Sequence, residues 1–334
     1  MLYYKCQQHL FYDIICPLFV GWGSGMSEKI SLESFNQSQK ERLEFIDFRI
    51  NFLGSIRRSD MADRFGIKEA AATRDITLYR ELCPNNVKYS TNKKKYYRSR
   101  NYSALFLTTT NEALRYLTHG FESRFKIKSG LINSFDMKHI SKLPDIDLLA
   151  TIMRAMHSKR VVKIKYLSTS DNIKTKTSRE IIPYAIANSG LRWHVRAFDR
   201  KRNAFIDLVL ARISSARRVK TKILEHEKFD EDIQWHRIVE MDLVPHPHMK
   251  AKDAIYLDYN FNEEGVFCIK MRAALAGYFL RFWNVDCTEN HTLRTKNDDF
   301  GKEYQLWLKS PTAALYKVES AFLAPGFILN KKSA

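Results

Sequence analysis

One stretch in the middle of the chain spaces its cationic side chains in a way that suits anion binding. If 191–199 (LRWHVRAFD) is a β-strand, Arg192, His194 and Arg196 share one face and the apolar residues between them share the other. Cations on one face repel each other, so we expect them to face water or an anion. Arg179 and Arg212 lie on neighbouring predicted strands and would join them. A hydrogen-bonded surface histidine is the simpler alternative for His194.

A second group of cations lies nearer the N-terminus. A helix over 68–82 would direct Lys68, Ala70, Ala71, Thr73, Arg74 and Thr77 outward. Small residues let a helix sit deep in a groove, Arg74 can form a bidentate contact with guanine, and Thr73 can bind a phosphate or a base. The hairpin that follows has no acidic residue among its cations, which are Lys88, Lys93, Lys94, Lys95, Arg98 and Arg100. Such a hairpin suits phosphates or the minor groove.

The elements around these residues predict a DNA-binding unit. Helical spacing over 38–53 ends at Gly54, Ser59 can cap a short helix through Phe65, and Gly66 supplies a turn before the third helix. Three helices followed by a basic hairpin make a winged helix-turn-helix, with the third helix in the major groove. A protein–protein module with a solvated hairpin is the alternative.

Composition agrees with a polyanionic partner. The 334 residues carry a net charge of +18, and 45% of them are hydrophobic. A chain of this length favours two or three domains, and the excess of positive charge favours nucleic acid or an acidic membrane surface. No apolar stretch is long enough to span a membrane. The five cysteines show neither disulfide nor metal spacing, which fits a reducing compartment.

We predict an α+β chain made of successive units. Residues 1–34 form a tail that is disordered or precedes the natural start, for which Met26 is our hypothesis. The other units are a winged helix-turn-helix (35–100), a helical connector (101–150), an antiparallel β-barrel domain (151–225), a linker (226–250) and a small α/β dimerisation domain (251–325).

Motifs for catalysis are missing from the sequence. It has no phosphate-binding glycine loop and no nucleophile elbow. His246 and His248 flank Pro247 without a third ligand at fixed spacing, so we interpret them as incidental. We therefore predict no enzyme activity, no metal and no cofactor.

Two segments resemble known regulators. RRSDMADRFGIKEAAATRDITLYREL (57–82) resembles the winged helices of DeoR-like and WYL-type regulators. That resemblance implies that Asp75 orients the third helix, whereas a simple partner for a neighbouring arginine is the alternative. Trp193-His194-Val195 is similar to the Trp-Tyr-Leu triplet of the WYL domain, an Sm-like β-barrel, although two of its three positions differ. IKYLS (164–168), SREIIPY (178–184) and ARI (211–213) support the match.

The WYL resemblance implies a ligand pocket for a nucleotide or short nucleic acid. Its lining would be Tyr166, Ser168, Arg179, His194, Arg196 and Arg212, to which the strand pattern adds Arg192. YFLRFWNVDC (278–287) and YQLWLKS (304–310) resemble the C-terminal extension of WYL regulators, which implies dimer contacts. The overall pattern resembles the branch associated with phage-defence systems.

These observations predict a cytoplasmic, homodimeric repressor that binds double-stranded operator DNA with inverted half-sites. A nucleotide or short nucleic-acid effector in the WYL domain would release the DNA. The alternative is a non-transcriptional accessory subunit that binds single-stranded nucleic acid and regulates a nuclease or helicase.

Overall fold

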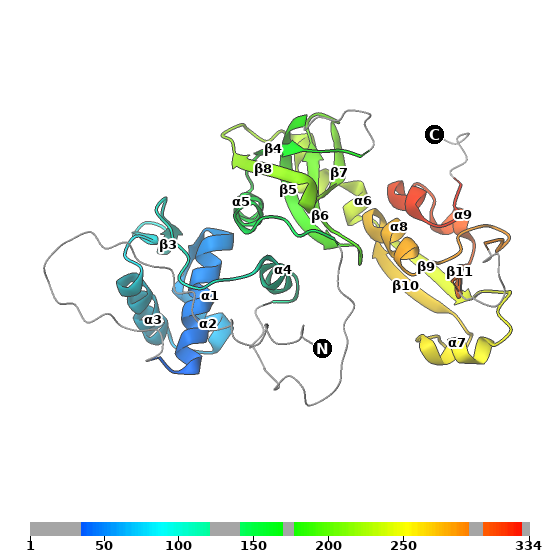
Figure 1. Ribbon diagram of the computed structural model, residues 1–334, viewed down its shortest axis with the longest axis horizontal. Coiled ribbons are helices and arrows are strands. Elements are labelled where there is room, and N and C mark those ends of the chain that lie inside the picture. Colours follow the sequence, from blue (N-terminus) through cyan, green and yellow to red (C-terminus); the bar gives the residue numbers. More distant parts are fainter. Residues whose placement is uncertain (1–34, 121–140, 170–176, 294–302, 329–334) are drawn as a thin grey trace, which may run out of the picture.

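The computed structural model describes residues 35–120, 141–169, 177–293 and 303–328. The predicted tail over 1–34, with Met26, lies outside these residues. Three parts that each contain a sheet follow one another along the long axis of the molecule (Figure 1).

The first part has the three helices and the hairpin that the sequence predicts. Its elements are α1 (Gln37–Leu53), β1 (Ser55–Ile56), α2 (Arg58–Phe65), α3 (Glu69–Leu82), β2 (Val87–Ser90) and β3 (Lys95–Arg98). The side chain of Asn36 caps α1 by accepting from the Gln39 amide at 2.8 Å. Gly54 and Gly66 end α1 and α2 in the left-handed conformation, with φ of 80° and 64°.

Two local predictions in this part need correction. Arg57, not Ser59, stands at the start of α2, and its amide donates to the Asp60 carboxylate at 2.7 Å. The hairpin also has a third strand, because Ser55 and Ile56 pair with Tyr97 and Tyr96. The sheet order is therefore β1-β3-β2, which ties the wing to the end of α1.

The described part of the predicted connector contains one whole helix and the start of a second. Helix α4 (Thr110–His119) begins with a capping box formed by Thr109 and Glu112. Helix α5 (Ile146–His157) begins at Asp145, whose side chain accepts from the amides of Asp147 and Leu148. The break that the sequence shows at 143–145 is thus the N-terminal cap of α5.

The central part is an antiparallel sheet of five strands in the order β7-β6-β5-β4-β8. The strands are β4 (Val162–Tyr166), β5 (Thr177–Asn188), β6 (Trp193–Asp199), β7 (Ala204–Val209) and β8 (Ile213–Arg218). The predicted antiparallel β-domain is present, but its sheet is open and does not close into a barrel. Strands β7 and β8 stand at opposite edges of an open sheet, and no pairing joins them within the described residues.

The C-terminal part contains a sheet in the order β10-β9-β11 and several short helices. Its main elements are α6 (Ile233–His236), β9 (Ile238–Pro245), α7 (Lys252–Asp258), β10 (Phe267–Arg272), α8 (Ala273–Phe282), β11 (Leu306–Leu308) and α9 (Pro311–Ala314). The predicted linker over 226–250 therefore contains β9, the middle strand of this sheet. The burial of β9 alternates along most of its length, a pattern typical of a strand with one face on a core.

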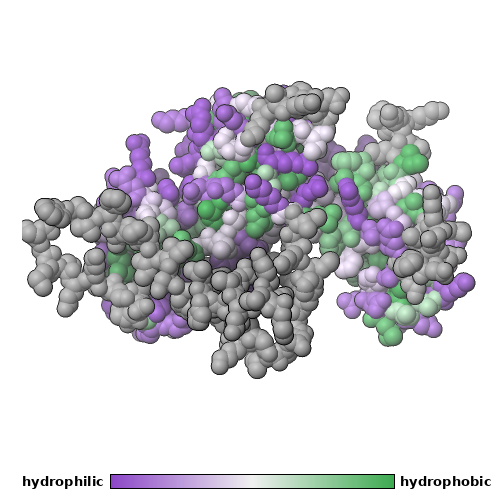
Figure 2. Space-filling model, in the orientation of Figure 1, coloured by the Kyte–Doolittle hydropathy of each residue, from purple (hydrophilic) through white to green (hydrophobic). Residues whose placement is uncertain are grey.

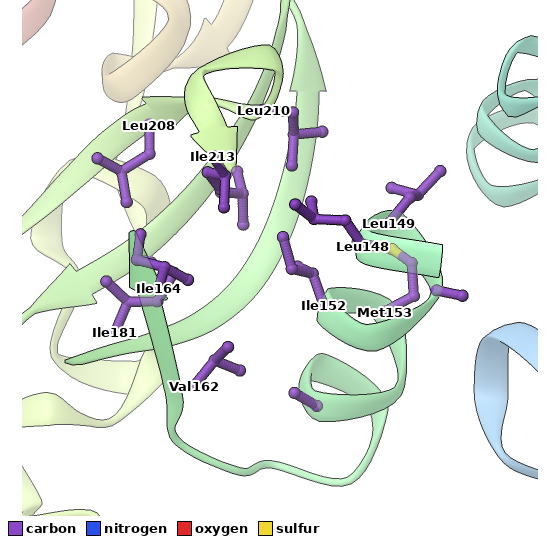
Figure 3. Packing of buried hydrophobic residues seen from close by; sticks show 14 of the residues in the cluster. Leu148, Leu149, Ile152, Met153, Val162, Ile164, Ile181, Leu208, Leu210 and Ile213 are labelled. Carbon is purple, nitrogen blue, oxygen red and sulfur yellow. The ribbon is translucent and has the colours of Figure 1, made fainter. Parts of the chain in front are cut away.

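One hydrophobic core links the winged helix to the central sheet. Leu148 and Ile152 of α5 point toward Val162, Ile164 and their neighbours on the sheet (Figure 3). The same cluster includes Phe48 and Phe52 of α1, while the other apolar residues of α1 pack into the winged-helix core. Helix α1 thus contributes to two cores.

Candidate nucleic-acid interface and effector site

Helix α3 presents one polar face to solvent. Arg74 and Thr77 are exposed, as is Lys68, the residue that begins the helix, whereas Ala71 and Thr73 are half-buried. The Thr73 hydroxyl already donates to the Glu69 carbonyl at 2.8 Å. The predicted DNA-contacting side chains of this helix therefore lie on its accessible side.

The opposite side of α3 is held by an ion pair. Arg42 of α1 donates to Asp75 through Nε at 2.7 Å and Nη2 at 3.4 Å, and the Asp75 side chain is 7% exposed. Asp75 thus pairs with another helix and not with an arginine of its own. Because a forked contact restricts rotation, this pair orients α3 on α1.

A buried carboxylate gives α3 a second attachment. Asp47 of α1 accepts from the Tyr79 hydroxyl of α3 at 2.6 Å and from the Tyr102 hydroxyl at 2.9 Å. The amides of Leu105 and Phe106 also donate to it, at 3.0 and 3.1 Å. Burial raises the pKa of Asp47, although these hydrogen bonds oppose that shift. Sequence reasoning missed this network, because its members lie up to 59 residues apart.

The cations of the wing differ in how far they are exposed to solvent. Lys93 and Lys94 are exposed at the turn, where Lys94 has a φ of 46°. Lys95 is half-buried, and burial together with the charge of Arg57 lowers its pKa. Arg98 is half-buried over the Tyr102 ring at 4.5 Å. Of these four cations, the two turn lysines are thus the more accessible to a phosphate.

On the central sheet, the predicted ligand residues Tyr166 and Arg179 meet inside the protein. Arg179 is 3% exposed and donates through Nη1 to Asp199 at 2.8 Å. Its guanidinium also lies 5.1 Å from the centre of the Tyr166 ring. The charge of Arg179 is therefore compensated by the protein itself.

Arg196 is held by two carboxylates. It donates to Asp232 through Nε at 2.8 Å and Nη2 at 2.9 Å, and to Asp207 at 3.3 Å. Burial alone would lower the pKa of Arg196, but the bonds to Asp232 and the charge of Asp207 raise it. The Tyr184 hydroxyl also donates to Asp232. Of the two environments predicted for this cation, water or an anion, the structure has an anion from the chain itself.

The remaining predicted ligand residues border this buried group. His194 is 6% exposed, and burial lowers its pKa to about 4, so its ring is neutral at neutral pH. The charges of Arg192 and Arg212 act on the pKa of His194 in the same direction as burial. Arg192 is exposed, while Arg212 and Ser168 are half-buried. Arg212 donates to the Thr169 hydroxyl at 3.3 Å. Hydrophilic residues cover much of this domain in the view of Figure 2.

Comparison with protein families matches all three parts of the chain. The BrxR transcriptional regulator winged helix-turn-helix domain matches residues 38–119, and the WYL domain matches 147–218. The BrxR transcriptional regulator C-terminal dimerization domain matches 238–314. The chain belongs to the BrxR family of WYL-domain transcriptional regulators.

Curated relatives agree with this membership. The BrxR-family chain is 32% identical to the DNA-binding transcriptional repressor CapW of Pseudomonas aeruginosa, over 74% of its own length and 83% of that protein. It is 28% identical to CapW of Escherichia coli (strain KTE188), over 76% and 85% of the two chains. A third CapW, from Stenotrophomonas maltophilia, is 27% identical over 74% and 84%. The chain is a regulator rather than an enzyme.

The histidines noted in the BrxR-family sequence form a local contact. His246 is buried and lies 3.0 Å from Asp286 through Nε2, while its Nδ1 accepts from the His248 amide at 3.3 Å. In the described part of the chain, no group of three or more His, Cys, Asp or Glu side chains could hold a metal ion. No helix in the same ranges is long and apolar enough to cross a membrane.

Proposed function

We propose that this BrxR-family chain is a homodimeric, DNA-binding transcriptional repressor in the bacterial cytoplasm, acting at a phage-defence locus. One observation carries the proposal: the exposed Arg74 and Thr77 lie on a helix whose other side is anchored by Asp75. An anchored helix can offer a guanidinium fork to a base edge in a fixed register. The relatives named CapW are DNA-binding repressors, which supports this direction of regulation.

The third helix and the wing would contact different parts of the DNA. Arg74 would read a guanine in the major groove, with Lys68, Ala71, Thr73 and Thr77 around it. Lys93 and Lys94 at the wing turn would bind phosphates, and Lys95 and Arg98 would support them from half-buried positions. The C-terminal dimerization match supports two such units on one duplex, and two-fold symmetry then requires inverted half-sites.

Effector binding would use the accessible cations of the central sheet. Arg192 is exposed and Arg212 is half-buried, and we infer that they bind the phosphate of a nucleotide or short nucleic acid, with Ser168 beside them. Tyr166, Arg179 and Arg196 would shape the site from below, since carboxylates already hold both arginines. The shared core of α5 and α1 provides a physical route from this sheet to the winged helix.

A gel-shift assay tests the DNA-binding part of this function. The purified chain is mixed with duplex DNA from its own upstream intergenic region, with either strand of it alone, and with excess nonspecific competitor. The proposal expects a discrete duplex complex that survives the competitor. A preference for single strands, or a smear that the competitor abolishes, would favour an accessory subunit that regulates a nuclease or helicase.

A further inference from the structure

A cavity of about 270 Å³ lies where the central sheet meets helix α8. One wall comes from the end of β5 and the turn at 188–190, together with His194 of β6 and Asp207 of β7. The other wall includes Leu275, Tyr278 and Phe282 of α8. Figure 1 shows this helix beside the sheet. We call this cavity the junction pocket.

The chemistry of the junction pocket differs from that of the proposed effector site, which uses the cations Arg192 and Arg212. Its α8 wall is apolar and aromatic, and none of its lining residues is lysine or arginine. His194 adds no charge at neutral pH, because burial lowers its pKa to about 4. The His194 and Tyr278 rings lie 5.0 Å apart between their centres and border the same space. Such a lining does not attract phosphate, but it suits an apolar molecule of modest size.

The lining of the junction pocket contains one carboxylate, that of Asp207. The Asp207 side chain is 10% exposed, and one of its oxygens, Oδ2, accepts from Arg196 at 3.3 Å and from the Tyr278 hydroxyl at 3.4 Å. Its other oxygen, Oδ1, is buried and accepts no hydrogen bond from the described residues.

We propose that the junction pocket binds a small, ring-bearing molecule that carries no negative charge. The apolar wall of α8 would cover the ring. This site shares His194 with the effector site proposed above, but it rests neither on that proposal nor on the operator interface.

A ligand in the junction pocket would bridge two parts of the chain. The turn at Gly190 already packs closely on α8, because a Cβ added there would come within 2.2 Å of the Phe282 ring. The pocket therefore lies beside a contact that has no room for a side chain. A bound ring would touch both walls and stabilise their present arrangement by mass action.

Saturation-transfer NMR on the full chain tests the proposal with three indole probes. Tryptamine and indole carry N–H donors without negative charge, whereas indole-3-acetate adds a carboxylate to the same ring. We expect saturable binding of the first two at concentrations up to about 10 mM, and at least about tenfold weaker binding of the acetate, since its charge would face Asp207. No saturable binding of tryptamine and indole, or equal binding of all three probes, would overturn the proposal.

Two variants locate the binding. Leu275→Trp fills the pocket from a half-buried position and should abolish tryptamine binding, whereas Leu257→Trp on α7, at a residue that is 89% exposed, should retain it. Asp207→Asn keeps the side-chain shape but removes the negative charge, so the preference against indole-3-acetate should shrink. It serves as the second test if Leu275→Trp does not fold. Undiminished tryptamine binding in folded Leu275→Trp, or an unchanged preference in Asp207→Asn, would contradict the assignment.

Discussion

The guanidinium of Arg154 on α5 donates to the backbone carbonyl of Asn51 in α1 through Nη1 at 2.6 Å. Burial, with the charges of Arg98 and Arg218, lowers the pKa of Arg154 to about 10, so the group stays cationic at neutral pH. Phe48 and Phe52 of α1 join the core beneath α5. The winged helix is therefore connected to the central sheet by a hydrogen bond as well as by apolar packing.

Removing the Arg154 contact should loosen this connection. Arg154→Met keeps the aliphatic stem but leaves the Asn51 carbonyl without its donor, so we expect the free energy of unfolding to fall by about 1–3 kcal/mol. Arg160→Met, at an exposed position, is the matched control and should change it by less than about 0.5 kcal/mol. Urea denaturation measures both values. Coincident curves for the two variants would mean that the contact contributes nothing.

The Arg42–Asp75 pair should affect operator binding although neither residue faces the DNA. Asp75→Asn weakens the attachment of α3 to α1, so we expect weaker operator affinity while the exposed Arg74 is unchanged. A double-mutant cycle with Arg42→Met, read by fluorescence anisotropy, should give a coupling energy of about 0.5–3 kcal/mol. Strictly additive effects would show that the pair does not position the helix.

Two arginines of β6 should behave differently when they are truncated. Arg196→Ala leaves the buried Asp232 carboxylate without its cationic partner and should destabilise the protein by about 3–5 kcal/mol. Arg192→Ala, at an exposed position, should leave the melting temperature nearly unchanged but weaken release of DNA by an anionic effector. Thermal denaturation and anisotropy with short oligonucleotides measure the two effects. An equal loss of stability in both variants would contradict the burial difference.

His194 should make stability depend on pH. Its folded-state pKa of about 4 lies below the ordinary value of 6.5, so the unfolded chain binds a proton first. The neutral ring makes its full contribution to the free energy of unfolding above pH 6.5. As the pH falls toward 4 this contribution is lost, which lowers the free energy of unfolding by up to about 3 kcal/mol. His194→Gln should lose less stability across this window than the parent chain does. If the free energies of unfolding of His194→Gln and the parent chain, measured by urea denaturation, fall equally from pH 7 to pH 4, His194 is not a neutral, buried residue.

The sequence predicts the winged helix well because its signals are local. Glycines after α1 and α2, apolar spacing along the helices and a run of lysines all lie close to the elements that they define. Strand β1 was missed because a two-residue strand has no periodicity of its own. The linker prediction over 226–250 relied on Pro245 and Pro247, but Pro245 is the last residue of β9 and so marks the end of a strand.

For the effector site, the sequence predicts the two faces of β6 but not the residues that pair with its cations. The cations of β6 are visible in the sequence, and the apolar face between them is confirmed, since Val195 and Ala197 lie in the core. The residue that pairs with the cationic side of β6 lies far away in the sequence. Asp232 is 36 residues beyond Arg196, in a segment expected to be a linker. A pattern of period two identifies faces but not the carboxylates that tertiary packing brings to them.

The most direct test of the DNA-binding account compares Arg74→Ala with Arg115→Ala, an exposed arginine on α4 outside the predicted interface. Both are titrated onto the upstream intergenic duplex, with excess nonspecific competitor and at moderate salt. The account predicts that Arg74→Ala weakens specific binding by about 1–3 kcal/mol while Arg115→Ala binds like the parent chain. If Arg74→Ala keeps the parent affinity, α3 does not read the operator as described.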